Sequence, residues 1–115
     1  MKKKIKIGLS GKKFNIEARE LPLIEQFIGL MFRTKDCDNL LFNRRGRWSI
    51  HSVFVFFPFL AVWLDERNRV VDYKIVKPFC FSVNSKRYFT KLIEIPVNNK
   101  NKSLISRFPS VHGKV

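Results

Sequence analysis

The chain has 115 residues, 45% of them hydrophobic, which fits one folded domain and leaves little room for a second. Its formal net charge is +14, carried mainly at the two ends: residues 1–13 hold six lysines, residues 97–115 hold four further basic side chains, and neither stretch contains an acid. The basic N-terminus is not followed by the apolar run of a signal peptide, because Gly8, Ser10, Lys12 and Lys13 interrupt it. The longest apolar run, residues 53–64, falls short of the roughly 20 residues that a membrane-spanning helix needs, so we expect a cytoplasmic protein.

Residues 2–31 predict a β-hairpin followed by a helix. Basic and apolar side chains alternate from Lys2 to Leu9, residues 14–19 repeat this period of two, and Ser10-Gly11-Lys12-Lys13 between them has the composition of a turn. Residues 20–31 change to a helical period, with one apolar stripe formed by Ile24, Phe27, Ile28 and Met31. We expect this segment to be the one helix.

The remaining elements read as short strands. Strands are predicted at 40–42, 48–51, 60–64, 70–77 and 86–96, with Pro58 interrupting the apolar run and a turn at 65–68, where Asn68 tolerates a positive φ. In the strand 70–77 we expect Val71, Tyr73 and Ile75 on one face and Val70 on the other. The predicted fold class is mainly β, a small β-barrel or jelly-roll-like sandwich with one short helix packed at its side. Residues 1–96 form the single domain, and residues 97–115 form a basic, loosely ordered tail.

The basic residues allow two interpretations. Basic arms can neutralise phosphates and give sequence-blind affinity for nucleic acid, whereas a basic proteome or a need for solubility produces the same excess. No helix-turn-helix pattern and no aromatic signature of an RNA-binding sheet favours the first interpretation. The candidate nucleic-acid contacts are the basic residues of the two ends and of one central cluster: Lys2, Lys3, Lys4, Arg44, Arg45, Arg47, Lys100 and Lys102.

No complete catalytic or metal-binding set is present in the sequence, and it predicts no cofactor. Arg33, His51 and Asp65 are candidate polar residues for a ligand or for the structure; His51 is either a general base or metal ligand, or a histidine bonded to backbone. Cys37 lies between Asp36 and Asp38, which raises the pKa of its thiol and disfavours catalysis. With Cys80 it forms no Cys-x-x-Cys pair, so we expect two free, packed thiols.

Several runs of residues resemble a known family. They are Gly29-Leu30-Met31-Phe32-Arg33, Leu40-Leu41-Phe42, Ile50-His51-Ser52, Phe57-Pro58, Trp63-Leu64-Asp65, Arg69-Val70-Val71 and Leu92-Ile93-Glu94-Ile95-Pro96. In order and spacing, residues 14–96 resemble the family known as domain of unknown function one-nine-two, found in bacteria and archaea. The resemblance implies a compact jelly-roll-like β-fold and no activity. Phe56 and Leu60 stand where the family has Arg and Asp, which indicates a structural ion pair lost as a pair, or an abandoned site.

Three functions follow as hypotheses. The sequence favours a non-enzymatic binding or structural domain, whose ligand pocket could be lined by residues 54–59. The alternative is sequence-nonspecific binding of RNA or DNA through the basic arms. An enzyme centred on His51 and Arg33 is the least favoured, because the sequence places no partner beside either residue.

Overall fold

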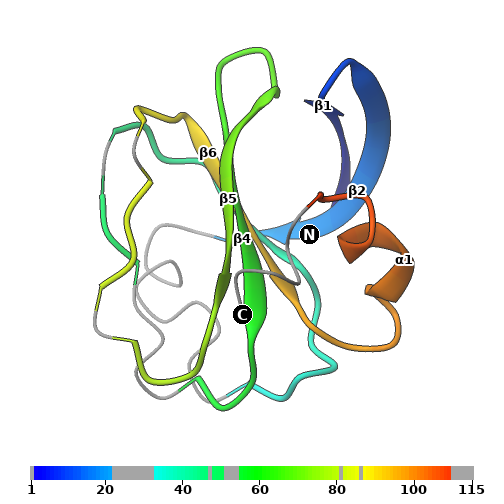
Figure 1. Ribbon diagram of the computed structural model, residues 1–115, viewed down its shortest axis with the longest axis vertical. Helices are drawn as coiled ribbons and strands as arrows, with labels where there is room; N and C mark the ends of the chain where they lie inside the picture. The colour runs from blue at the N-terminus through cyan, green and yellow to red at the C-terminus, as the bar shows by residue number, and fades with distance from the viewer. Residues whose placement is uncertain are drawn as a thin grey trace.

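One curled sheet, a half-barrel of six strands, organises the protein (Figure 1). The structure, a computed structural model, describes residues 2–21, 33–46, 48–50, 55–80, 82–85 and 87–109. The strands are β1 (Lys2–Leu9), β2 (Lys12–Glu20), β3 (Leu40–Phe42), β4 (Phe59–Leu64), β5 (Val70–Val76) and β6 (Lys91–Pro96), in the spatial order β1-β2-β3-β6-β4-β5. The fold class is confirmed: mainly β, with one short helix, α1 (Lys102–Ile105), at the side of the sheet.

The N-terminal hairpin forms as the alternation predicts. β1 and β2 are antiparallel, with Ile5 opposite Ile16 and Ile7 opposite Phe14. Ser10 and Gly11 have φ values of 52° and 80°, and a two-residue turn with both φ values positive matches the twist of the flanking strands. The turn is therefore shorter than expected, and Lys12 and Lys13 belong to β2.

The two central strands are buried on both faces. All six residues of β4 are buried, and β6 is buried from Leu92 to Pro96. Because side chains of a strand alternate between faces, the pair supplies two separate cores. The hairpin core contains Ile5, Ile7, Ile16, Ala18, Leu41, Leu60, Val62, Leu64, Ile93, Ile95, Ile105 and Phe108. The loop core contains Leu21, Leu40, Phe42, Ile50, Val55, Phe57, Phe59, Ala61, Trp63, Val76, Phe89 and Leu92.

A β-bulge places Val70 and Val71 of β5 on other faces of the sheet than the alternation predicts. The register between β4 and β5 shifts between Trp63 and Leu64, so that Leu64 pairs with Val70 while Trp63 pairs with Asp72. The extra residue interrupts the alternation. Val70 therefore packs against the hairpin core together with Tyr73 and Ile75, and Val71 packs against the loop core. The prediction, which grouped Val71 rather than Val70 with Tyr73 and Ile75, is wrong for these two residues.

The two edges of the sheet meet at one point. The Gly8 amide of β1 donates a 3.0 Å hydrogen bond to the Asn68 carbonyl, and Gly8 forms a parallel bridge with Arg69. Asn68 lies in the β4–β5 turn with φ 60°, as expected for an Asn that tolerates the left-handed region. β2 and β3 pair in parallel on the other side of the hairpin, with Arg19 opposite Leu40.

Several predicted boundaries differ from the structure. Glu20 is the last residue of β2 rather than the start of a helix, and the rest of the predicted helix, 22–31, lies outside the described residues. In the predicted strand 48–51, Ile50 forms only an isolated bridge with Val83. β6 begins at Lys91, because Phe89 pairs with Gly46 instead of extending the strand. No helix in the described part of the chain has the length and apolarity that crossing a bilayer takes.

Residues 97–109 pack against the sheet instead of trailing from it as a loosely ordered tail. α1 directs Ile105 into the hairpin core, and Phe108 follows it there with 2% of its surface exposed. The Phe108 ring makes edge-on contacts with Phe14 at 5.9 Å and Tyr73 at 5.2 Å between centroids. The Tyr73 hydroxyl donates a 2.6 Å hydrogen bond to the Pro109 carbonyl. Residues 110–115 lie outside the described part.

Truncating Phe108 tests this docking. Phe108→Ala removes a buried ring from the hairpin core, so we expect the free energy of unfolding in urea to fall by roughly 3 kcal/mol. Ser103→Ala, at an exposed position of the same helix, is the control and should change it by less than about 0.5 kcal/mol. Equal stability of the two variants would mean that the segment contributes nothing to the core.

Candidate functional site

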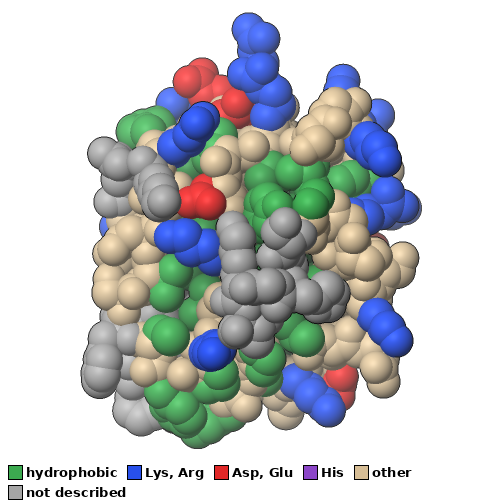
Figure 2. Space-filling view, viewed as in Figure 1, with side chains coloured by type: hydrophobic (Ala, Val, Ile, Leu, Met, Phe, Trp, Pro, Cys, Tyr) green, Lys and Arg blue, Asp and Glu red, His purple; other side chains and the backbone are tan. Residues whose placement is uncertain are grey.

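The outer face of the hairpin carries a row of cations. Ile5, Ile7, Ile16 and Ala18 point into the hairpin core, so their neighbours must face solvent. The strand pairing sets Lys2 opposite Arg19, Lys4 opposite Glu17, Lys6 opposite Asn15 and Gly8 opposite Lys13. We call these side chains the hairpin face: Lys2, Lys4, Lys6, Lys13, Asn15, Glu17 and Arg19. In Figure 2 blue Lys and Arg side chains lie along the upper right of the molecule, where Figure 1 places β1 and β2.

Few acids neutralise this face. Lys2 forms a 3.3 Å ion pair with Asp38, and both side chains are largely exposed, so the pair contributes little stability. Lys3, on the other side of β1, pairs with Glu20. Within the described part of the chain no salt bridge engages Lys4, Lys6 or Lys13. The hairpin face therefore keeps a net positive charge with Glu17 as its own acid.

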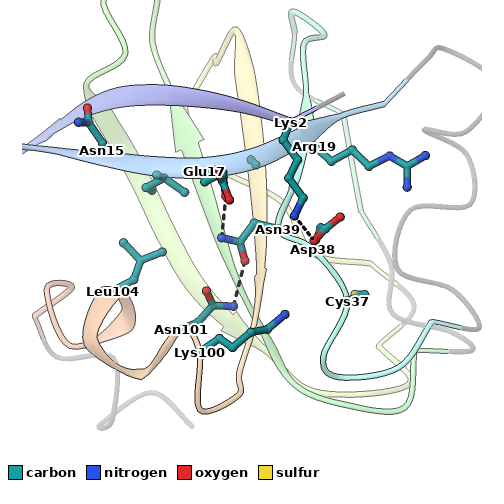
Figure 3. A pocket seen from close by; sticks show the side chains of 12 residues that line it. Lys2, Asn15, Glu17, Arg19, Cys37, Asp38, Asn39, Lys100, Asn101 and Leu104 are labelled. Atoms are coloured by element: carbon teal, nitrogen blue, oxygen red, sulfur yellow. Dashed lines mark hydrogen bonds and ion pairs between the residues drawn. The ribbon is translucent and has the colours of Figure 1, made fainter.

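A polar pocket of about 360 Å³ adjoins the hairpin face (Figure 3). It lies between β2, the loop before β3 and the turn before α1, and Lys2, Arg19 and Lys100 supply cations to its lining. Its wall is a chain of amides: Asn101 Nδ2 donates to Asn39 Oδ1 at 2.9 Å, and Asn39 Nδ2 donates to the Glu17 carbonyl at 3.0 Å. These hydrogen bonds hold the loop before β3 and the turn before α1 against β2. Lys2, Arg19 and Lys100 therefore line the same pocket.

The C-terminal lysines lie beside this pocket on the same turn. The Lys100 ammonium donates a 2.8 Å hydrogen bond to the Asp36 carbonyl, which leaves Lys100 exposed at the rim. Lys102 lines a second pocket of about 470 Å³ together with Lys35, Val97 and Ile105. The structure thus brings Lys2 and Lys100 to one pocket and places Lys4 beside Lys2 on the hairpin face. The same face contains Lys6, Lys13 and Arg19, which the sequence analysis did not select.

The described part of the central basic cluster lies in the loop that follows β3. Arg44 and Arg45 are exposed in the loop after β3, and the Arg44 guanidinium lies 5.0 Å from the centroid of the Trp48 ring. The Trp48 indole N–H donates a 3.0 Å hydrogen bond to the Arg44 carbonyl. Arg47 lies outside the described residues.

The three polar candidates do not form one site. Asp65 lies in the β4–β5 turn, whereas Arg33 precedes a loop whose Lys35 carbonyl accepts a hydrogen bond from Asn98, beyond the end of β6. Because β4 and β6 are antiparallel, these two positions lie at opposite ends of the sheet. His51 lies outside the described residues.

Asp65 has a structural role in its turn. Its Oδ1 accepts 2.9 Å hydrogen bonds from the amides of Arg67 and Arg69, and its Oδ2 accepts a 3.0 Å bond from Arg69 Nε. Partial burial acts to raise the pKa of Asp65, but the hydrogen bonds from Arg69 and Arg67 outweigh it and hold the pKa below 3.8. A carboxylate that is bonded in this way closes the turn.

Both cysteines are free and half-buried, as predicted. The pKa of the Cys37 thiol is raised, as the sequence analysis expected, but burial is the main cause; Asp38 adds to the rise and Arg33 opposes it. Among the described residues no group of three or more His, Cys, Asp or Glu side chains is placed to hold a metal ion.

Glu94 is the titratable group that the sequence analysis missed. It lies on β6, directly opposite Leu40 and Ala61, and 5% of its surface is exposed. Burial among these apolar neighbours raises its pKa to about 8, so the carboxyl is largely protonated at neutral pH. The indole N–H of Trp63, on the same face, is buried and has no hydrogen-bond partner among the described residues. The position of Glu94 inside the apolar run 92–96 was the available signal.

Comparison with known proteins gives a fold but no family. No family model matches the chain, and no curated protein does. A crystal structure of a protein of unknown function from Novosphingobium aromaticivorans is similar over 90% of this chain and 78% of its own, with a TM-score of 0.73 and 15% identity. A putative transcription regulator from Sinorhizobium meliloti is similar over 86% of this chain and 81% of its own, with a TM-score of 0.69 and 15% identity. At this identity the likeness shows the fold alone, and the resemblance to domain of unknown function one-nine-two stays a prediction.

Replacing Asp65 tests its role in the turn. Asp65→Asn removes the charge that strengthens three hydrogen bonds, so we expect the free energy of unfolding at pH 7 to fall by roughly 1–2 kcal/mol. A lowered pKa gives stability that is present above pH 3.8 and lost as the pH falls through the folded-state pKa. The difference between wild type and variant in urea unfolding should therefore shrink in acid; a constant difference from pH 7 to the acid limit contradicts the assignment.

The stability that Glu94 contributes falls as the pH rises, whereas that from Asp65 falls as the pH is lowered. The unfolded chain releases this proton near pH 4.5, whereas the folded protein keeps it until about pH 8. Stability from this group is therefore full below pH 4.5, falls by roughly 1 kcal/mol per pH unit above it, and levels off beyond pH 8. Because glutamine cannot ionise, the free energy of unfolding of Glu94→Gln in urea should rise relative to that of the wild type as the pH increases. A gap between the two proteins that does not change with pH would show that Glu94 is ionised in the folded state.

Proposed function

We propose that this protein is a non-enzymatic binding domain that holds the phosphate backbone of nucleic acid, without reading its sequence, on the hairpin face. The observation that carries the proposal is the register of β1 and β2. It sets Lys2, Lys4 and Lys6 beside Arg19 and Lys13 on one solvent-facing surface, opposite the side that closes the hairpin core.

The geometry suits a charged backbone better than a compact ligand. Alternate residues of a strand are about 6.7 Å apart, so the lysines of β1 form a row of roughly 13 Å rather than a point. Lys100 extends this row across the polar pocket. Cations in a row replace the counterions of successive phosphates, and the release of those ions drives binding that weakens as salt rises.

Other functions find less support. Among the described residues of the predicted pocket lining 54–59, Val55, Phe57 and Phe59 are buried in the loop core, and only Phe56 is largely exposed. The enzyme hypothesis has no geometry to support it, because His51, on which it is centred with Arg33, lies outside the described residues. The family resemblance supports a shared β-fold and brings no activity. The description of the Sinorhizobium protein as a putative transcription regulator is compatible with a nucleic-acid partner.

A salt titration of charge variants tests the proposal. The triple variant Lys4→Gln, Lys6→Gln and Lys13→Gln removes three exposed charges, and the matched variant with Arg at the same positions keeps them. Binding of a labelled RNA strand and a DNA duplex is followed by fluorescence anisotropy from about 50 to 200 mM salt. We expect the slope of log K against log salt to fall by roughly one for each lost phosphate contact in the Gln variant, and to stay unchanged in the Arg variant.

Two results would contradict this function. One is wild-type affinity that is absent, or that does not change with salt. The other is a Gln variant that melts at the same temperature as the wild type and keeps the full salt slope, since the hairpin face would then make no phosphate contact.

A further inference from the structure

An exposed pair of aromatic rings lies where β4 begins and β5 ends. The exposed fractions are 59% for Phe56 and 55% for Phe79, and their rings meet edge-on with centroids 5.4 Å apart. In Figure 2 green hydrophobic side chains gather at the lower end of the molecule, where Figure 1 places the start of β4. Their neighbours Phe57 and Phe59 are buried, so the pair is an addition to the core rather than a part of it.

The pairing of β4 and β5 explains why the two rings meet. Phe59 pairs with Val76, and continuing this register outward sets Pro58 opposite Lys77 and Phe56 opposite Phe79. A proline cannot donate to the ladder, so Pro58 and Pro78 end the hydrogen bonding while the two chains stay side by side. The rings are thus held at a fixed place by the sheet.

The backbone of Phe79 is strained. Its φ is 64°, a region that bulky L-residues rarely adopt. Such strain costs on the order of 1–3 kcal/mol and gathers at binding sites, where the surrounding structure enforces it. Here it holds a large apolar ring in solvent, which neither the core nor solubility requires.

The sequence on either side of the pair carries basic residues and no acid, since residues 39–64 and 73–93 contain no Asp or Glu. Lys77 lies next to the rings, because the continued register sets it opposite Pro58. Arg44, Arg45, Arg87 and Lys91 lie toward the other end of β4, where Lys91 pairs with Leu64 and Phe89 with Gly46. A partner that uses the rings together with nearby lysines must be anionic and must also offer flat apolar faces.

A cationic pocket continues the surface. The Val97 amide donates a 3.0 Å hydrogen bond to the Pro58 carbonyl, next to the aromatic pair. Val97 also lines the pocket of about 470 Å³ that Lys35 and Lys102 share with Asp36. An extended strand can therefore run from the rings past Val97 to these lysines.

We infer that this end of the sheet binds single-stranded RNA or DNA, with unpaired bases stacked on Phe56 and Phe79 and phosphates held by Lys35 and Lys102. Stacking platforms beside cationic grooves are how proteins hold single strands without sequence preference, and every base offers such a face. A duplex keeps its bases stacked inside and cannot use the rings. The inference rests on the proposed function in one respect, that the ligand is a nucleic acid. The binding site itself is a different one, because the rings do not belong to the hairpin face.

The test compares three ligands of equal length: an oligo-dT strand, an abasic strand with the same phosphates, and a duplex. The double variant Phe56→Ala and Phe79→Ala removes the rings, and the matched variant Phe56→Tyr and Phe79→Tyr keeps them. We expect the wild type to bind oligo-dT more tightly than the abasic strand. The Ala variant should lose roughly tenfold or more for oligo-dT alone, as expected from the cost of one or two stacked bases, and the Tyr variant should lose little.

The outcomes separate this inference from the proposed function. Salt-sensitive binding of all three ligands with equal affinity for oligo-dT and abasic strand overturns the stacking site and leaves the hairpin face supported. The stacking site is also overturned if an Ala variant with the wild-type melting temperature keeps its affinity for all three ligands, or loses affinity for all three equally. Self-association of the wild type that the Ala variant abolishes assigns the rings to a second copy of this chain. Absence of binding to any ligand overturns both proposals.

Discussion

The burial of β4 and β6 on both faces is the constraint on which the rest of the structure depends. Each strand alternates its side chains between two cores, with Leu60, Val62 and Leu64 on one side and Phe59, Ala61 and Trp63 on the other. The hairpin and α1 cover the first face, and described loop residues such as Ile50, Val55, Phe57 and Phe89 cover the second. An apolar run with no polar face fixes a layered arrangement, because each side needs its own cover.

This arrangement moves the charge outward. Once Ile5, Ile7, Ile16 and Ala18 are committed to the hairpin core, the alternation of β1 and β2 leaves only lysines, Arg19 and a few polar groups for solvent. Phe56 and Phe79 differ from the other aromatic residues near them, because both rings are exposed and neither belongs to a core. Cations in a row and rings beside cations are both suited to nucleic acid; the first lie on the hairpin, and the second lie where β4 begins and β5 ends.

Much of the fold was predictable from the sequence because it rests on local periodicity. The hairpin, β3, β4 and the Asn68 turn follow from alternation and turn chemistry. The bulge at Trp63 and Leu64 could not be predicted, since a single extra residue in β5 leaves the pattern of hydrophobic residues almost unchanged. The docking of Phe108 was missed because a basic, polar composition conceals two apolar anchors, Ile105 and Phe108.

The candidate site was predictable only in part, because a surface joins residues that are distant in sequence. Lys2 and Lys100 were selected from charge alone, but their common pocket depends on Asn39 and Asn101. Lys6, Lys13 and Arg19 were available from the same alternation that predicted the strands. The aromatic pair needed the β4–β5 register, which sets Phe56 against Phe79 beyond two prolines.

The decisive measurement of where nucleic acid binds is the change in backbone amide chemical shifts as a single-stranded oligonucleotide is added. We expect changes confined to β1 and β2 at the hairpin face, to residues 98–102, and to the neighbourhood of Phe56 and Phe79. Shifts that stay constant throughout, or that change mainly around Glu94 and Trp63 in the loop core, would contradict it.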